Sequence, residues 1–180
     1  MAALRLFFAV PVPAAAAATL DRFHAQHRHL DGWRWPPKRS WHLTVAFLGN
    51  VDDAALPILA ELGAAAAAQT EADTIRLTRL EWWPSAQHPR LLVATGEASP
   101  ALRRLNAHLS RALARQNLPF DERPLRPHVT LARLRRSAHR TTLPDAYADE
   151  VAVASLALYR SEKGPAGSDY RIIWQTQLGG

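Results

Sequence analysis

Cysteine is absent from the 180 residues, which excludes a disulfide framework, thiolate metal sites and a cysteine nucleophile. No apolar run reaches about 18 residues without a charge, so we expect no transmembrane helix. The sequence also lacks a Gly-rich phosphate loop, a Gly-x-Ser-x-Gly elbow and a His-Glu-x-x-His helix, which leaves nucleotide-hydrolase, serine-hydrolase and zinc-protease functions without support. Acidic residues are the minority: 16 Asp and Glu against 22 Lys and Arg give a net charge of +6, which favours polyanionic partners such as nucleic acid.

The composition is that of a folded globular protein. Hydrophobic residues make up 48% of the chain and charged residues 21%, which supplies enough apolar material for a core. A length of 180 residues allows one domain or two small lobes. The first residues resemble a signal peptide, but Pro11 and Pro13 interrupt the apolar stretch and Arg5 lies within it. We therefore expect residues 4–10 to form a buried strand and the protein to be cytoplasmic.

Periodicity and turn residues predict alternating strands and helices. The predicted strands cover residues 4–10, 41–48, 74–83, 90–96, 128–134, about 150–160 and 169–178. Helices are predicted over residues 14–30, from an Asp52 N-cap to about residue 68, and after a Ser99 N-cap with Pro100 in the first position. We expect Gly49 and Asn50 to form the turn that closes the strand 41–48. In outline, the order β-α-β-α-β occurs twice.

A short segment is repeated in the sequence. His42-Leu-Thr-Val-Ala-Phe-Leu48 and His128-Val-Thr-Leu-Ala-Arg-Leu134 lie 86 residues apart (128 − 42) and share His, Thr, Ala and Leu at alternate positions. This two-residue period is typical of a strand, so the His and Thr of each copy should share one face. The intervening residues should point into a core on the opposite face: Leu43, Val45 and Phe47, and Val129 and Leu131. The recurrence predicts duplicated lobes that face each other across a groove.

Two opposed His-x-Thr strands suit phosphoryl chemistry. An imidazole accepts or donates a proton at about pH 6.5, so a pair can act as base and acid in one turnover. Threonine hydroxyls on opposite walls can donate hydrogen bonds to a phosphate and fix the phosphorus between the rings. One histidine would take a proton from water while the other protonates the departing oxygen, without a covalent intermediate or a metal ion. A single His-x-Thr is more often an ordinary strand with a polar face, and the repetition favours the catalytic interpretation.

These motifs and their flanks resemble the RNA 2′,3′-cyclic phosphodiesterase, or 2′-5′ RNA ligase, family of the two-histidine phosphoesterase superfamily. The resemblance covers nearly the whole chain and includes Arg5-Leu-Phe-Phe-Ala-Val-Pro, Arg34-Trp35 before the first motif, Arg126-Pro-His-Val-Thr-Leu-Ala-Arg133, and Leu158-Tyr-Arg-Ser-Glu162 with Gly167 and Tyr170. It implies an α+β fold, a single bilobal domain over residues 1–180 with two antiparallel sheets across a central groove and motifs at 42–45 and 128–131. It also implies a metal-independent enzyme without a cofactor that opens a terminal 2′,3′-cyclic phosphate to leave a 2′-phosphate.

The resemblance assigns roles to five residues. It makes His42 the proton donor to the leaving 3′-oxygen and His128 the acceptor of a proton from water, although the near-identical motifs by themselves would allow the reverse. It makes Thr44 and Thr130 ligands of the phosphate. Arg133 matches a position expected to help hold the phosphate, which suits a guanidinium, while a surface cation is the alternative.

Tryptophans alternate with basic residues immediately before the first motif. The tryptophans are Trp33, Trp35 and Trp41, and the basic residues are Arg34, Lys38 and Arg39. Such a segment can stack a terminal base and attract its backbone, and Trp35 is the candidate for substrate binding. Packing in the core is the alternative for each tryptophan.

Two further groups of residues have a functional and an ordinary interpretation. A metal site is conceivable at Asp21, His24, His27, His29 and Asp31, but these residues match no ligand motif, and a solvent-facing helix surface explains them better. The basic run at residues 135–140 adds salt-sensitive affinity for RNA if it lies near the groove.

Three functions remain open at this stage: a cyclic phosphodiesterase, a 2′-5′ RNA ligase acting on tRNA halves, and a non-catalytic module that binds RNA ends. The first two use the same residues by microscopic reversibility, and hydrolysis should dominate in water. The expected partner is RNA with a 2′,3′-cyclic phosphate end, either a tRNA fragment or a short oligonucleotide, with no membrane involved. We expect the protein to be monomeric.

Overall fold

The computed structural model describes residues 2–13, 17–29, 31–135, 141–144, 147–164 and 167–179. Most of the predicted basic run, residues 136–140 with His139, lies outside the described residues. The same holds for residues 14–16 and Leu30 of the first predicted helix. Within the described ranges, no helix is both long enough and apolar enough to span a membrane.

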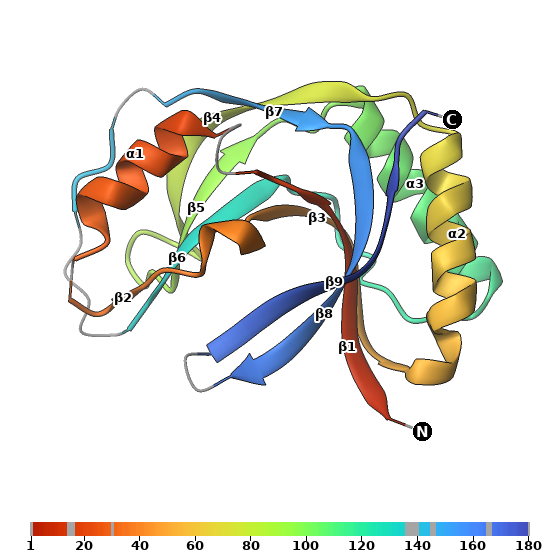
Figure 1. Cartoon of the computed structure of the whole chain (residues 1–180). Helices are drawn as coiled ribbons and strands as arrows, with labels where there is room; N and C mark the ends of the chain where they lie inside the picture. The colour runs from red at the N-terminus through yellow and green to blue at the C-terminus, as the bar shows by residue number, and fades with distance from the viewer. Residues whose placement is uncertain are drawn as a thin grey trace.

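Two antiparallel sheets form the framework of the protein (Figure 1). The four-stranded sheet has the order β3-β1-β8-β9 and consists of β1 (Ala3–Pro11), β3 (His42–Asp52), β8 (Ser155–Gly164) and β9 (Gly167–Gln177). The five-stranded sheet has the order β2-β6-β5-β4-β7 and consists of β2 (Trp33–Arg34), β4 (Asp73–Trp83), β5 (Leu91–Gly96), β6 (His128–Leu134) and β7 (Asp149–Val153). Because every strand pair is antiparallel, the prediction of an α+β fold with two antiparallel sheets is confirmed.

The two halves of the chain exchange strands between the sheets. β8 and β9 return from the C-terminal half and join β1, while β4 from the first half lies between β5 and β7. Each sheet therefore contains strands from both halves, and neither half of the sequence completes a sheet by itself.

The predicted order of elements is correct only in part. In the first half β1, α1 (Ala18–His27), β3, α2 (Leu56–Ala68) and β4 follow the β-α-β-α-β outline. β2 and the 3₁₀ helix η2 (Lys38–Ser40) lie between α1 and β3, where no strand or helix is predicted. In the second half α3 (Pro100–Arg115) precedes β6, and the described residues between β6 and β7 contain no helix. The strand predicted near 150–160 is two strands, β7 and β8, because the chain passes from one sheet to the other at Ala154.

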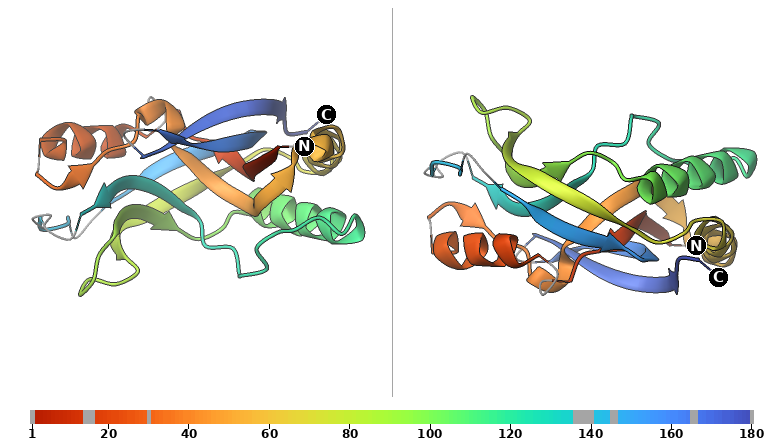
Figure 2. Two further views of the ribbon diagram at one scale, coloured as in Figure 1. Left: turned by 90° about the horizontal axis from the view of Figure 1, so that it is seen from below. Right: turned by 90° about the horizontal axis from the view of Figure 1, so that it is seen from above.

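The helices lie at two ends of the molecule, α1 at one and α2 with α3 at the other (Figure 2). Asp52 accepts a hydrogen bond from the N–H of Ala54 and begins the 3₁₀ turn η3 (Asp53–Ala55) that leads into α2. Ser99 accepts one from the N–H of Leu102 at the start of α3. The predicted Ser99 N-cap is confirmed, whereas Asp52 caps the 3₁₀ turn and α2 itself begins after Ala55. The apolar face of α3 is fully buried and consists of Ala101, Leu102, Leu105, Leu109 and Leu113.

β3 does not stop at the predicted turn but continues beyond Gly49. Leu6 and Phe7 of β1 pair with Gly49 and Phe47, which leaves Leu48 as an extra residue in a β-bulge. Gly49 has a φ of 74°, in the left-handed region that glycine adopts without steric cost. The turn-forming residues therefore bend a strand where the sequence predicts that they end it.

Candidate active site

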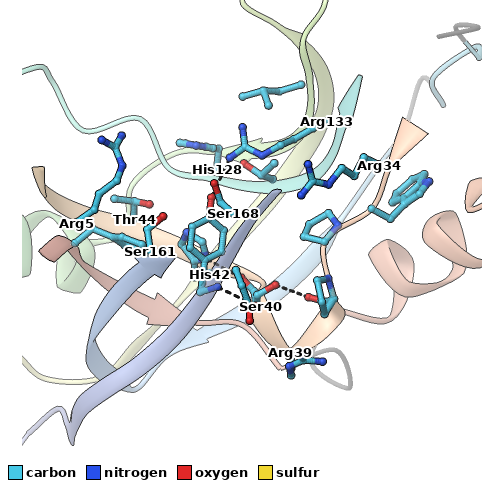
Figure 3. Close-up of a pocket in the computed structure, with 18 of the residues that line it drawn as sticks. Arg5, Arg34, Arg39, Ser40, His42, Thr44, His128, Arg133, Ser161 and Ser168 are labelled. Atoms are coloured by element: carbon cyan, nitrogen blue, oxygen red, sulfur yellow. Dashed lines mark hydrogen bonds between the residues drawn. The ribbon is translucent and has the colours of Figure 1, made fainter. Parts of the chain in front are cut away.

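The two copies of the repeated segment face each other in the fold. β3 is the edge strand of the four-stranded sheet, β6 lies in the five-stranded sheet, and the two strands approach each other. His42, Thr44, His128 and Thr130 are partly exposed and line one shared cavity. Figure 3 shows both histidines in the middle of this cavity. The intervening residues are buried as predicted: Leu43, Val45, Val129 and Leu131.

A β-bulge follows the threonine in each copy. The pairing of β3 with β1 skips Val45, and the pairing of β6 with β5 skips Leu131. An extra residue reverses the alternation of faces beyond it, so Phe47 and Arg133, each five residues after its histidine, line the cavity. The prediction that Phe47 points into the core is wrong for this reason. Asn106 of α3 supports the first bulge by donating a hydrogen bond to the carbonyl oxygen of Val45 at 2.7 Å.

Each imidazole is held by the backbone two residues before it. His42 Nδ1 lies 2.6 Å from the carbonyl oxygen of Ser40, and His128 Nδ1 lies 2.8 Å from the carbonyl oxygen of Arg126. Because a carbonyl oxygen can only accept, Nδ1 carries the proton and donates it in both rings. This leaves Nε2 of each histidine as the nitrogen that can exchange a proton with a ligand in the cavity.

The environment of the cavity lowers the pKa of both histidines. Desolvation is the main cause that lowers the pKa of His42 from 6.5 to about 4, with smaller contributions from the charges of His128 and Arg133, against the hydrogen bond to Ser40. Desolvation also lowers the pKa of His128, with the charge of Arg126 acting in the same direction and its carbonyl in the opposite one. Both rings are therefore predominantly neutral at pH 7 in the free protein. An anion bound between them would raise both pKa values.

Aromatic rings enclose His42 and account for its desolvation. The ring centroids of Phe7, Tyr170 and Tyr159 lie 4.8, 5.1 and 5.3 Å from that of His42. Phe7 also stacks on Tyr159, with the centroids 5.0 Å apart and the planes nearly parallel at 2°. Phe7 and Tyr159 are buried in a small apolar cluster, against which Tyr170 packs. The ring of His42 therefore rests on a rigid apolar support.

The cavity has a volume of about 680 Å³ and positively charged walls. Among the described residues, four arginines line it, Arg5, Arg34, Arg39 and Arg133, against one carboxylate, that of Asp169. Figure 3 shows Arg34 and Arg133 on one side of the histidines and Arg5 on the other. The excess of positive charge favours an anionic ligand.

Sequence motifs alone do not identify most of the residues that line this cavity. Tyr170 of β9 accepts a hydrogen bond from Arg133 Nη2 at 2.9 Å, which ties the second motif to the opposite sheet. β8 and β9 also contribute Ser161, Ser168 and Asp169. These residues lie far along the chain from both motifs, and no spacing links them to either. The available signal is that Arg5, Arg34 and Tyr170 occur in the stretches that resemble the two-histidine family.

The three tryptophans before the first motif have different surroundings. Trp33 and Trp41 are buried in the core, which is the ordinary alternative for both. Trp35 is partly buried, lines the cavity and stacks on Trp33 with the ring centroids 5.3 Å apart. Its indole nitrogen is buried and has no hydrogen-bond partner among the described residues. Among the three, Trp35 is the one that can contact a ligand in the cavity.

The residues considered for a metal site are engaged elsewhere or exposed. Asp21 forms an ion pair with Lys38, and His27 Nδ1 lies 2.9 Å from the carbonyl oxygen of Phe23. His24 packs edge-on against Trp35. Across the described ranges, no group of three or more His, Asp or Glu side chains is arranged to hold a metal ion.

Comparison with protein families gives two matches along the chain. A family model described as LigT like phosphoesterase matches residues 10–93 and again residues 93–170. Each match contains one of the two His-x-Thr motifs, so the internal repeat extends beyond the motifs themselves.

Curated relatives and solved structures agree with this match. A protein of Thermus thermophilus named RNA 2′,3′-cyclic phosphodiesterase is 32% identical in an alignment 182 positions long that covers 98% of this chain and 91% of that protein. A protein of Escherichia coli with the same name is 30% identical and covers 87% of this chain and 86% of its own length. A crystal structure from Thermus thermophilus superposes with a TM-score of 0.85 at 31% identity over 98% of both chains. The crystal structure of E. coli LigT complexed with 3′-AMP superposes with a TM-score of 0.77 at 27% identity, over 98% of this chain and 99% of that one.

Proposed function

Because the chain belongs to the LigT-like phosphoesterase family, we propose that it is an RNA 2′,3′-cyclic phosphodiesterase that hydrolyses a terminal 2′,3′-cyclic phosphate to a 2′-phosphate. The curated relatives that carry this name and match most of the chain support the reaction. The E. coli relative that was crystallised with 3′-AMP supports a nucleotide phosphate as the group that the cavity accepts.

The paired histidines are the observation that carries the proposal. Both rings donate Nδ1–H to a backbone carbonyl, both line one cavity, and both have Nε2 available to a ligand. Two such rings around one phosphorus provide a base on one side and an acid on the other, which in-line displacement requires. A structural role for the pair would not account for their matched tautomers and shared cavity.

In the proposed mechanism His128 Nε2 takes a proton from water as the water oxygen attacks the phosphorus. The bond from phosphorus to the 3′-oxygen breaks, and His42 Nε2 supplies the proton that the leaving oxygen needs. The product is a 2′-phosphate and a free 3′-hydroxyl, with His128 protonated and His42 neutral. Exchange with solvent then restores the starting protonation states.

The remaining motif residues bind the phosphate. Thr44 and Thr130, from opposite strands, donate hydrogen bonds to its non-bridging oxygens, so the phosphorus stays between the two rings. Arg133 adds a charge-assisted contact, and the hydroxyl of Tyr170 holds its guanidinium in position. Trp35 stacks on the terminal base, and its buried indole N–H is free of protein partners among the described residues.

The proposal also concerns the whole chain. Residues 1–180 act as one bilobal domain in which the motifs at 42–45 and 128–131 form a single site. The exchange of strands supports this, because each motif strand lies in a sheet that contains strands from both halves of the sequence.

Hydrolysis of a short RNA with a 2′,3′-cyclic phosphate end, in the presence of a chelator, tests the function. We expect a 2′-phosphate product, and we expect His42→Ala and His128→Ala each to lower kcat by about 10²- to 10⁴-fold. A 3′-phosphate product would mean that the 2′-oxygen is the leaving group. Tight binding of the RNA without turnover would mean that the protein is an RNA-end-binding module and not an enzyme. Joining to an added 5′-hydroxyl RNA would identify a 2′-5′ ligase.

A sulfur substitution separates the roles of the two histidines. A cyclic phosphate with sulfur in place of the bridging 3′-oxygen releases a thiolate, which departs without being protonated. His42→Ala should therefore lose far less activity on this substrate than on the natural one, while His128→Ala should lose as much on both. The opposite pattern would mean that His128 is the acid and His42 the base.

A further inference from the structure

A second cavity of about 680 Å³ has His128 in its wall. The two cavities share part of their walls, namely Thr44, Phe47, Leu91, His128 and Arg133. A volume of this order is sufficient for a nucleotide-sized ligand, since small-molecule pockets occupy about 300–1,000 Å³. One nucleoside with its cyclic phosphate therefore needs one of the two cavities, and the other is left without a role in the reaction as proposed.

The second cavity has its own cations. Arg90, Arg123 and Arg126 line it and do not line the first cavity. Arg123 pairs through both Nε and Nη2 with the carboxylate of Asp121, which also lines this cavity. No carboxylate of the described residues forms an ion pair with Arg90 or Arg126, so their charges are available to a ligand.

An aromatic ring lies on the border between the second cavity and the catalytic histidines. The ring of Trp83 is 4.5 Å from that of His128, and the guanidinium of Arg126 lies 4.4 Å from the Trp83 ring centroid. A hydrogen bond from Trp83 Nε1 to Glu81 at 2.9 Å fixes the orientation of the indole. Cations beside a fixed aromatic ring are typical of sites that bind single-stranded nucleic acid, where bases stack and phosphates pair.

We propose that the second cavity binds the nucleotides that precede the terminal cyclic phosphate in a single strand of RNA. This inference rests on the proposed function and assigns a binding site to the part of the strand that precedes the reacting nucleotide. A 2′,3′-cyclic phosphate requires a ribose, and the preceding phosphate lies one nucleotide step away. A subsite for that phosphate must therefore lie next to the catalytic site, as this cavity does at His128. Arg90 and Arg126 contact the backbone, and Trp83 is the platform for a base.

Steady-state kinetics on two substrates test the proposal. One is a 2′,3′-cyclic mononucleotide and the other is a short RNA with the same terminal nucleotide. We expect Arg90→Ala to raise KM for the RNA about fivefold with little change in kcat, and to leave both constants for the mononucleotide unchanged. The dependence of log(kcat/KM) on log(salt concentration) should become less steep by about 0.7 for the RNA only, as for one lost phosphate contact on a single strand.

Two further variants serve as matched controls. Arg104→Ala removes the same charge from the exposed side of α3, outside both cavities, and should change neither KM nor kcat for either substrate. Arg90→Lys retains the charge and should restore most of the affinity for RNA. Equal effects of Arg90→Ala and Arg104→Ala would show that only net charge matters and would overturn the proposal.

The outcomes distinguish this inference from the proposed function. Turnover of neither substrate by the unmodified protein would reject both. Turnover of both substrates, with the same ratio of KM values in the Arg90→Ala variant as in the unmodified protein, would reject the strand-binding cavity alone. A third outcome concerns a 5′-hydroxyl RNA without a cyclic end, used as an inhibitor. If Arg90→Ala abolishes this inhibition but leaves KM for the cyclic-ended RNA unchanged, the cavity binds a separate strand. That result would also overturn the proposal.

Discussion

His42 is the residue whose surroundings depart most from those of a solvated histidine. Its ring rests on Phe7 and Tyr159 and meets the edge of Tyr170, and this desolvation holds its pKa at about 4. An acid with such a pKa holds no proton at pH 7 in the free protein. The aromatic rings disfavour the protonated form of His42, and the negative charge of the substrate phosphate must stabilise it. Protonation of His42 is therefore coupled to substrate binding.

The pH dependence of the reaction should reveal this coupling. Both histidine pKa values lie below 6.5 in the free protein, so its singly protonated form is most abundant below pH 6.5 and declines as the pH rises. We expect kcat/KM, which reflects the free protein, to peak below pH 6.5, and kcat, which reflects the complex, to peak at higher pH. Both constants measured from pH 4 to 9 on a cyclic mononucleotide would test this. Identical profiles, or a kcat/KM maximum above pH 7, would contradict the coupling.

The two threonines should matter through their hydroxyls and not through their shape. Thr44→Val and Thr130→Val keep the volume of the side chain but remove a donor to the phosphate, and each should lower kcat/KM about 100-fold. Thr44→Ser and Thr130→Ser retain the hydroxyl and should retain most of the activity. Equal losses in the Val and Ser variants would point to packing of the strand as the cause.

At the scale of elements, helix α1 begins without a local cap. Ala17 precedes it and makes no side-chain cap. The buried carboxylate of Asp149 in β7 instead accepts hydrogen bonds from the N–H groups of Thr19 at 3.0 Å and Leu20 at 2.9 Å, and from the hydroxyl of Tyr147 at 2.7 Å. A residue about 130 positions away in the sequence thus satisfies the first turn of α1, which no local pattern predicts.

Loss of this carboxylate should destabilise the fold without altering the chemistry. Asp149→Ala leaves two backbone donors and a hydroxyl without their partner, and we expect the free energy of unfolding to fall by about 2 kcal/mol. Asp149→Asn retains one acceptor oxygen and should cost less. Urea denaturation measures both effects, and kcat on a cyclic mononucleotide should stay within twofold of the unmodified value. A large loss of kcat at full stability would mean that β7 positions the site.

At the scale of the whole molecule, the exchange of strands joins the two halves of the chain. β4 joins the sheet of β5 and β6, and β8 and β9 join that of β1 and β3. The C-terminal hairpin places Tyr170 beside both His42 and Arg133, so it connects the two motifs directly. Separating the two halves of the chain would break strand pairing in both sheets, so the halves should unfold together.

Unfolding should therefore occur in one transition. Trp174 packs near Gly63 of α2 at one end of the molecule, whereas near β2 Trp33 stacks on Trp35 and meets Trp82 edge-on. Fluorescence of the tryptophans and far-ultraviolet circular dichroism should give the same midpoint in urea. Two separated transitions would contradict a single domain over residues 1–180.

Local patterns were sufficient for most elements but not for the walls of the cavity. The alternation in residues 42–48 and 128–134 predicts the strands and the shared face of histidine and threonine, because a strand repeats every two residues. The same alternation places Phe47 on the wrong face, since the bulge at Val45 depends on pairing with β1. Arg133 was predicted to bind phosphate from a family resemblance, and the corresponding bulge at Leu131 brings it to the cavity.

The sequence by itself determined which chemistry this protein carries. The repeated His-x-Thr motifs, the basic composition and the missing nucleophile and metal motifs depend on residue type and spacing along one strand, which are local properties. The tertiary structure decided how those residues work. The pKa of His42, the support of Arg133 by Tyr170 and the second cavity beside His128 all depend on contacts between segments far apart in the chain. Desolvation and long-range pairing have no local signature, because they arise only when the two sheets come together.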